Sequence, residues 1–103
     1  MFDNYAVSFS GQASVSGKLY LSDMFQQYCF SVNQADWPKL PKSYNDSRKP
    51  WFCFIKPDTT LVDSIKKSIS ETGGIANITI DNYVINQYPG EIANNATLIK
   101  INP

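Results

Sequence analysis

The sequence predicts an α+β protein that is mainly β, built either as a small antiparallel sheet or as an OB-like, partly open barrel. Apolar and polar residues alternate along several short segments, as they do in half-buried strands. One stretch, at about residues 59–72, has apolar residues at helical spacing, and two more strand-like segments follow it. With 103 residues, of which 43% are hydrophobic, the chain is expected to form a single domain over residues 1–103.

The first two alternating segments are expected to form a hairpin. Apolar residues occupy alternate positions from Tyr5 to Phe9, and they do so again among the residues from Val15 to Leu21. A three-residue loop over residues 11–13 places Phe9 opposite Val15, so that both apolar sets share one face. A two-residue loop would put them on opposite faces, and we therefore prefer the longer one.

Two further strands are predicted before the helix, at Tyr28–Val32 and Trp51–Lys56. In the second of these, apolar residues occupy both faces from Trp51 to Ile55. Such a strand is either central and covered on both sides, or it presents one aromatic face to a partner. Each strand carries one of the two cysteines, Cys29 and Cys53. We expect reduced, buried thiols, with a disulfide between neighbouring strands as the alternative.

The helix is expected over residues 58–72. Leu61, Ile65 and Ile69 recur every four residues, and a residue at 58, 59 or 60 is expected to cap the first turn. Two glycines at 73 and 74 end the pattern.

Two strands follow the helix. In the first, an alternation of isoleucine and valine is broken at Asn82. The second is expected at Ala96–Ile101, with Ile99 and Ile101 facing inward. Strands, one helix and two strands are the element order of an OB-fold, a five-stranded Greek-key barrel. Four strand candidates precede the helix where that fold has three, so a simple sheet covered by the helix fits equally well.

The composition argues against an enzyme. The chain has no histidine, which removes the usual general base near neutral pH and the commonest metal ligand. Two cysteines alone do not make a zinc site, and the five glycines form no phosphate-binding motif. We therefore expect no catalytic residues, no metal and no cofactor.

A long loop rich in proline, aromatic and basic residues is predicted over residues 34–50. It contains four Lys/Arg and two Asp in a chain whose formal net charge is zero. Long loops in compact domains are usually functional, and prolines reduce the entropy that such a loop loses on binding. In the alternative, the tryptophans fold back onto the sheet as a satellite core. The candidate partner-binding residues are Trp37, Lys39, Lys42, Tyr44, Arg48, Lys49 and Trp51.

The function expected from this pattern is a small binding protein that covers or bridges a partner protein through the loop. Small accessory or inhibitor proteins of phages and mobile elements share these features. The alternative is an OB-like protein that binds single-stranded nucleic acid. In that case bases would stack on Tyr20, Tyr28, Trp37 or Trp51, and phosphates would contact Lys18, Lys39, Lys42, Arg48 and Lys49.

The sequence also sets expectations for location and assembly. No basic segment followed by an apolar run opens the chain, so we expect no signal peptide and a cytoplasmic location, which is the host cytoplasm for a phage-encoded protein. No apolar stretch approaches the length of a membrane span. A homodimer could form if Ala96–Ile101 were an edge strand that pairs with its own copy.

Overall fold

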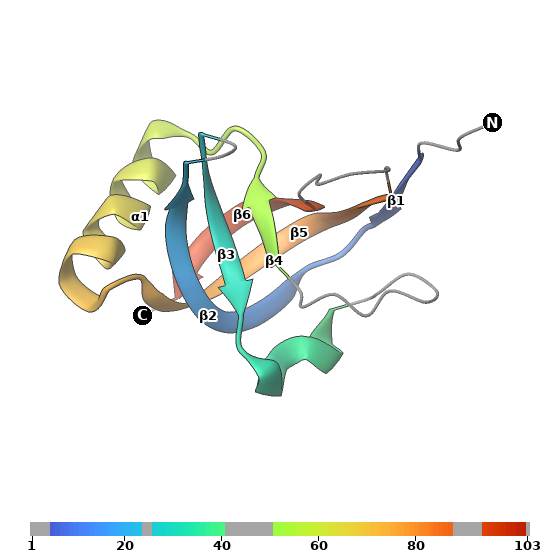
Figure 1. Cartoon of the computed structure of the whole chain (residues 1–103), viewed down its shortest axis with the longest axis horizontal. Coiled ribbons are helices and arrows are strands. Elements are labelled where there is room, and N and C mark those ends of the chain that lie inside the picture. The colour runs from blue at the N-terminus through green and yellow to red at the C-terminus, as the bar shows by residue number, and fades with distance from the viewer. Residues whose placement is uncertain (1–4, 24–25, 41–50, 88–93, 103) are drawn as a thin grey trace.

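The computed structural model describes residues 5–23, 26–40, 51–87 and 94–102. They form six strands, one α-helix and one 3-10 helix (Figure 1). The mainly β, α+β class is therefore confirmed, with the helix before the last two strands. The elements are β1 (Tyr5–Phe9), β2 (Ala13–Ser22), β3 (Gln27–Val32), η1 (Gln34–Lys39), β4 (Trp51–Phe54), α1 (Thr59–Thr72), β5 (Ile75–Gln87) and β6 (Asn94–Asn102).

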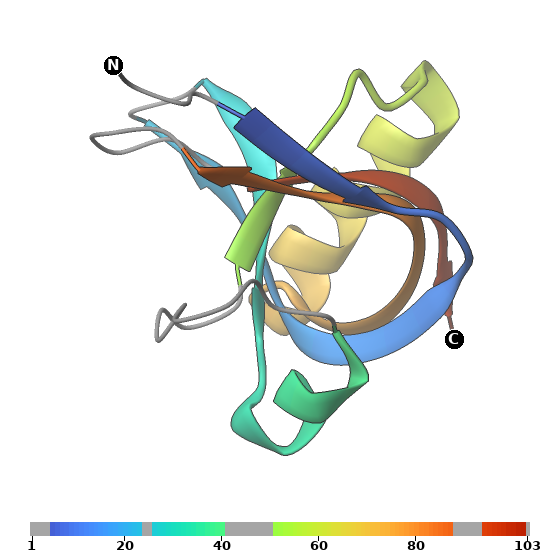
Figure 2. The same cartoon turned by 90° about the vertical axis from the view of Figure 1, so that its right-hand side faces the viewer.

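Five of these strands close into a barrel. β2 pairs with β3, β3 with β4, β4 with β6, β6 with β5, and β5 with β2. Among these pairs β4–β6 is parallel and the others are antiparallel. Figure 2 shows the strands curving around the interior, with α1 behind them. Of the two architectures predicted, the OB-like barrel is the one formed, and α1 lies between its third and fourth strands.

The first strand, β1, lies outside the barrel, which accounts for the surplus strand candidate. It pairs with the far end of β5, where Phe9 is opposite Tyr83. The predicted hairpin of β1 with β2 is therefore wrong. The reason is the length of β5, whose 13 residues pair first with β2 and then with β1. Gly11 lies in the connection between β1 and β2 with a φ of 106°, and its N–H donates to a carboxylate oxygen of Asp81 at 3.0 Å.

A bulge in β5 explains the alternation that breaks at Asn82. Asn82 has a φ of 50°, and the pairing of β5 with β6 shifts register between Asp81 and Val84. Ile80 before the bulge and Tyr83 after it are both buried, so the inward positions change from even to odd numbers.

A second register shift corrects the prediction for Ile99. β5 pairs Thr79 with Lys100 but Ile80 with Leu98, which leaves Ile99 without an opposite residue. Ile99 is 38% exposed, whereas Leu98 is buried. The start of β6 also pairs with both β4 and β5, so the predicted edge strand is part of the barrel wall there. A homodimer stays a prediction.

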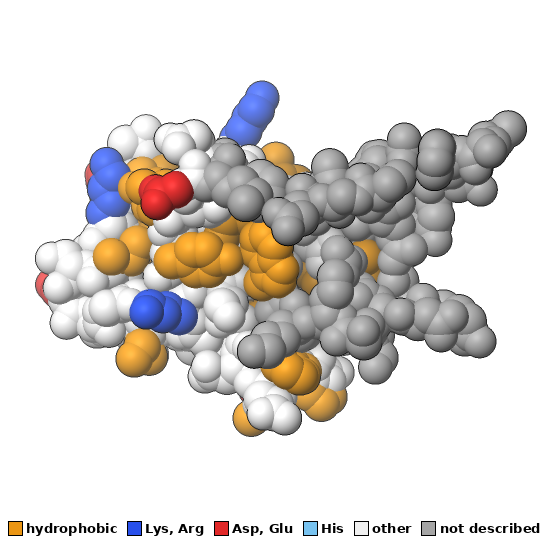
Figure 3. Space-filling model, viewed as in Figure 1, with side chains coloured by type: hydrophobic (Ala, Val, Ile, Leu, Met, Phe, Trp, Pro, Cys, Tyr) orange, Lys and Arg blue, Asp and Glu red, His pale blue; other side chains and the backbone are white. Residues whose placement is uncertain are grey.

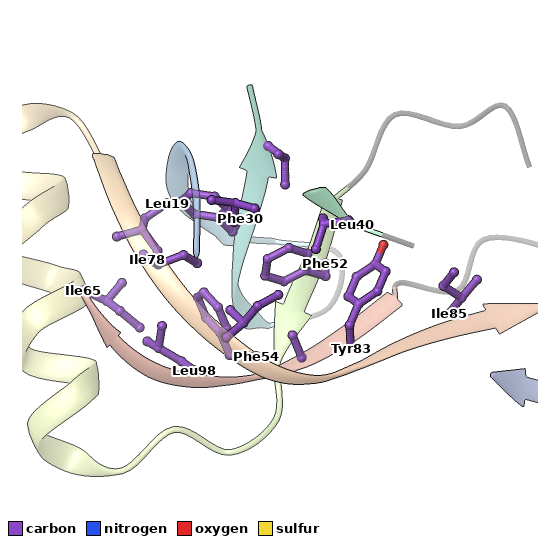
Figure 4. Close-up of a cluster of buried hydrophobic side chains, with 14 residues drawn as sticks. Leu19, Phe30, Leu40, Phe52, Phe54, Ile65, Ile78, Tyr83, Ile85 and Leu98 are labelled. Atoms are coloured by element: carbon purple, nitrogen blue, oxygen red, sulfur yellow. The ribbon is translucent and has the colours of Figure 1, made fainter. Parts of the chain in front are cut away.

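The barrel interior contains a cluster of aromatic rings. The centroid of the Phe52 ring lies 5.8 Å from those of Phe30 and Phe54 and 5.6 Å from that of Tyr83. Figure 4 shows the ring of Phe52 between those of Phe30 and Tyr83. Ile65 of α1 is fully buried against this core, so the helix closes one end of the barrel.

The ends of α1 follow the sequence signals. The side chain of Asp58 accepts a hydrogen bond from the N–H of Leu61 at 2.8 Å, which caps the first turn. Gly73 adopts the left-handed conformation at the last turn. Within the described part of the chain, no helix has the length and apolarity that crossing a membrane requires.

Candidate functional site

The outward side chains of three neighbouring barrel strands form one continuous surface. Residues of β2, β3 and β4 that alternate with the core residues point away from the barrel interior. The register places Lys18 opposite Ser31 and Ser31 opposite Trp51, and the next row runs through Tyr20, Cys29 and Cys53. We call this surface the outer face: Lys18, Tyr20, Ser31 and Trp51 form it, and Cys29 and Cys53 are buried beneath these side chains. Figure 3 looks onto these strands and shows hydrophobic side chains gathered near the middle of the molecule.

A disulfide joins Cys29 to Cys53 in the centre of the outer face. The two residues are directly opposite each other in the β3–β4 pair, with Cα atoms 3.8 Å apart. The expectation of two reduced thiols is therefore wrong, because it took no account of this register. The burial that was expected is confirmed, since both cysteines are 0% exposed.

Two aromatic side chains pack against the disulfide-bonded cysteines. Tyr20 of β2 and Trp51 of β4 are both partly buried and pack against the cluster of Cys29 and Cys53. Burial raises the pKa of the Tyr20 phenol above its ordinary value of 10.0, so the ring stays uncharged at neutral pH. The outer face thus offers two neutral rings on the two strands that flank β3, one outward row apart in the register. The cation of Lys18 lies in the same row as Trp51, two residues before Tyr20 on β2.

Tyr28 lies on the other side of the sheet from these rings. It neighbours Cys29 in sequence, pairs with Leu21 and packs partly buried against the main core. The structure therefore does not bring Tyr28 to the outer face, where Tyr20 and Trp51 lie.

The first part of the predicted loop is an ordered 3-10 helix, η1, fastened to the barrel. The indole N–H of Trp37 donates to the carbonyl oxygen of Val32 at 2.9 Å, and the ring packs partly buried against the core. Leu40, just after η1, is buried in the same core. Trp37 is therefore folded back onto the barrel, which is the alternative that the sequence left open to an exposed partner-binding side chain. Lys42, Tyr44, Arg48 and Lys49 lie outside the described residues.

The acidic side chain of η1 provides another attachment. Asp36 accepts a hydrogen bond from the backbone N–H of Ser16 at 2.6 Å and forms an ion pair with Lys39 at 3.2 Å. The Ser16 hydrogen bond, and after it Lys39, hold the pKa of the Asp36 carboxyl below its ordinary value of 3.8. Lys39 is therefore engaged with a carboxylate of its own helix.

These contacts predict a contribution of Asp36 to acid stability. A carboxyl whose pKa is lowered by folding stabilises the folded state above its unfolded-state pKa, and this contribution is lost as the pH falls through the folded-state value. We expect the thermal midpoint to fall as the pH drops below about 4, and to fall less steeply in Asp36→Asn. Ser70→Ala, at an exposed position of α1 and without a titratable group, should retain the wild-type pH profile. Parallel profiles for Asp36→Asn and the wild type would contradict the assignment.

The described residues also form a groove of about 510 Å³ between α1 and the barrel. Two amides in its wall are engaged within the protein, because Asn102 donates to Asn77 at 2.6 Å and Asn77 donates to Ser16 at 2.8 Å. The groove has no aromatic lining residue. The outer face is therefore the stronger candidate for a binding site.

Comparison of the chain with known protein families, curated proteins and solved structures finds no match.

Sequence reasoning named the two rings and Lys18, but it did not place the cysteines in the site. The alternation of residues along their strands does indicate which way the cysteines face. Cys29 alternates with the buried Phe30, and Cys53 alternates with Phe52 and Phe54, so both cysteines belong to the outward set of their strands.

Proposed function

We propose that the protein binds single-stranded nucleic acid on the outer face, with bases stacked on Tyr20 and Trp51. The observation that carries this proposal is the position of the rings. OB-type barrels bind oligonucleotides on the face of their second and third strands, and here those strands are β3 and β4. Trp51 belongs to β4, and Tyr20 lies beside β3 on the neighbouring strand.

The chemistry of the outer face suits a ligand without fixed sequence. Every base has a π-face, so stacking on an aromatic side chain tolerates all four bases. Lys18 is placed to contact a phosphate next to a base that stacks on Tyr20. Within the described residues it is the one cation of the outer face, and the chain as a whole has nine basic and nine acidic residues. Most of the affinity is therefore expected from stacking.

Replacing a ring tests the proposal directly. We expect Trp51→Ala and Tyr20→Ala each to weaken binding of a fluorescent 15-nucleotide oligothymidine by roughly 5- to 150-fold, because a stacked base contributes about 1–3 kcal/mol. Trp51→Phe retains a ring and should retain most of the affinity. If the wild-type protein does not retard the oligonucleotide in a low-salt gel, the proposal is wrong.

The salt dependence of binding measures how many cations take part. Single strands give a slope of log affinity against log salt of about −0.7 per neutralised phosphate. Lys18→Ala is expected to reduce the magnitude of the slope by about 0.7, whereas Lys66→Ala, at an exposed position of α1, should leave it unchanged. If Lys42, Arg48 and Lys49 also contact phosphates, the wild-type slope should approach about −3.

A partner protein is the second candidate, and the charge balance favours it. Nucleic-acid binders usually carry a basic excess, which this chain lacks. Partly exposed Trp and Tyr side chains are also typical interface hot spots. In this case the oligonucleotide does not bind, and a partner captured from lysate by the wild type is lost in Trp51→Ala but retained in Lys66→Ala.

An accessory or inhibitor role of the kind that phages encode stays a prediction, and so do a cytoplasmic location and the absence of enzymatic activity. The disulfide counts against a permanently reducing compartment, because disulfides are rare in cytosolic proteins.

A further inference from the structure

We infer that the Cys29–Cys53 disulfide regulates the outer face: the face binds its ligand when the disulfide is formed and loses affinity when a dithiol reduces it. This inference rests on the proposed function, because it concerns the same surface. Its physical basis is that both rings expected to stack bases pack against the two disulfide-bonded cysteines.

The disulfide is the covalent part of a short strand pairing. Among the described residues, β3 and β4 pair at three positions, which are Cys29 with Cys53, Phe30 with Phe52, and Ser31 with Trp51. The side chains of the middle pair point into the core, so the disulfide is the cross-strand contact next to Trp51 on the outer side. Its loss removes the covalent cross-strand link next to Trp51, while the pairing of the two strands remains.

The rings respond because they pack against the two cysteines. Both cysteines are fully buried, and Tyr20 and Trp51 are the partly buried side chains packed against them. Two thiols that are no longer bonded occupy more space than a disulfide. The side chains packed on them must therefore move, and the spacing of the two rings changes. The phenylalanine core lies on the other side of the sheet, so the barrel itself can persist.

The chemical step is thiol–disulfide exchange with a dithiol. Both cysteines are fully buried, so the exchange requires the side chains packed against them to move aside. One thiolate of the reductant then attacks a cysteine sulfur, which forms a mixed disulfide and releases the other cysteine as a thiolate that takes a proton. The second thiol of the reductant then displaces the remaining cysteine. The protein gains two electrons and two protons, and the reductant leaves as a disulfide. Because the chain has two cysteines, the exchange has a single target in the protein.

Ligand and disulfide must affect each other equally. If the oxidised protein binds a ligand more tightly than the reduced protein, the ligand favours the oxidised form by the same factor. A tenfold preference therefore lowers the reduction potential by about 30 mV in the presence of saturating ligand. This shift is independent of any substitution.

The test compares the affinity of the oxidised and reduced wild-type protein for the 15-nucleotide oligothymidine, with far-UV circular dichroism recorded on each form. We expect reduction by dithiothreitol to weaken binding about five- to tenfold, the lower end of the loss expected from one stacking contact, and reoxidation to restore it. Cys29→Ser combined with Cys53→Ser should bind as weakly as the reduced form and should not respond to dithiothreitol. The potential measured with and without oligonucleotide should shift as stated.

Four results would decide against the inference. Equal affinities of the two forms overturn it and leave the proposed function intact, as does an unchanged potential. Loss of the circular dichroism signal on reduction also overturns it, because the disulfide would then stabilise the whole barrel. Absence of binding by either form refutes the proposed function, and the inference fails with it.

Discussion

Phe52→Ala is expected to lower the free energy of unfolding by about 3–5 kcal/mol, the usual cost of removing a large buried ring. Phe52 is 0% exposed and contacts rings from three strands, with Phe30 on β3, Phe54 on β4 and Tyr83 on β5. The substitution leaves a cavity at the point where these strands meet. A domain of this size has about 5–15 kcal/mol of stability in total, so the variant should lose a large share of it.

Chemical denaturation followed by tryptophan fluorescence measures this loss. Phe52→Leu serves as the matched control, because it retains an apolar side chain and should cost less than half as much. A surface change such as Ser70→Ala should stay within about 0.5 kcal/mol of the wild type. If Phe52→Ala also stayed within that limit, Phe52 would not be the centre of the core.

Gly17→Ala is expected to lower the free energy of unfolding by about 3 kcal/mol or more, although it adds a single methyl group. Gly17 is opposite Val32 of β3 and also opposite Ala76 of β5, so β2 has a partner on both sides there. A Cβ atom at this position would collide with the carbonyl oxygen of Ser31 and approach the ring of Phe30 to 2.9 Å. Neither neighbour can yield easily, because one is backbone and the other is a buried ring.

The thermal midpoint provides a convenient measurement for Gly17→Ala. A loss of about 1 kcal/mol lowers the midpoint of a domain of this size by roughly 4–8 °C, so a decrease of more than about 12 °C is expected. Lys18→Ala, at the next and exposed position, should change the midpoint little and serves as the control. A Gly17→Ala protein as stable as Lys18→Ala would show that β2 and β3 do not approach each other this closely.

Local signals in the sequence predicted the local elements. The helix and its end at Gly73 follow from residues within a few positions of one another, and the sequence narrowed the cap to residues 58, 59 and 60, of which Asp58 is the one observed. The alternation broken at Asn82 also marked the place of the β5 bulge. These features depend on backbone preferences and short-range hydrogen bonds, which a single sequence displays.

Partner choice between distant strands could not be predicted in the same way. The barrel closes because β4 pairs with β6, where Phe52 is opposite Asn94, and no short loop fixes that register. β1 was assigned to β2 because they are adjacent in the chain, whereas β5 is long enough to take both as partners. Alternation indicates which face a residue occupies, but it does not indicate which strand lies beside it.

The same limit applied to the candidate site. Tyr20 and Trp51 could be named from their residue types, but their common contact with the disulfide depends on the β3–β4 register. That register also decides whether Cys29 and Cys53 meet. The sequence allows Trp37 to be either an exposed side chain of a loop or a side chain packed back onto the sheet. Its hydrogen bond to the carbonyl oxygen of Val32 shows that it is packed onto the sheet.

The central position of β5 has a consequence for how the protein is made. Val15 of β2 pairs with Ile78, and Tyr5 of β1 pairs with Gln87. Both strands therefore need β5 as a partner, and β5 is synthesised more than 50 residues after them. At roughly 5–20 residues per second, these strands wait several seconds with unpaired edges. The hairpin of β2 and β3 has a short connection and is available during this time, whereas barrel closure must follow translation of β5 and β6. Nascent chains halted before Ile75 are therefore expected to expose apolar strand surface to chaperones and to aggregation.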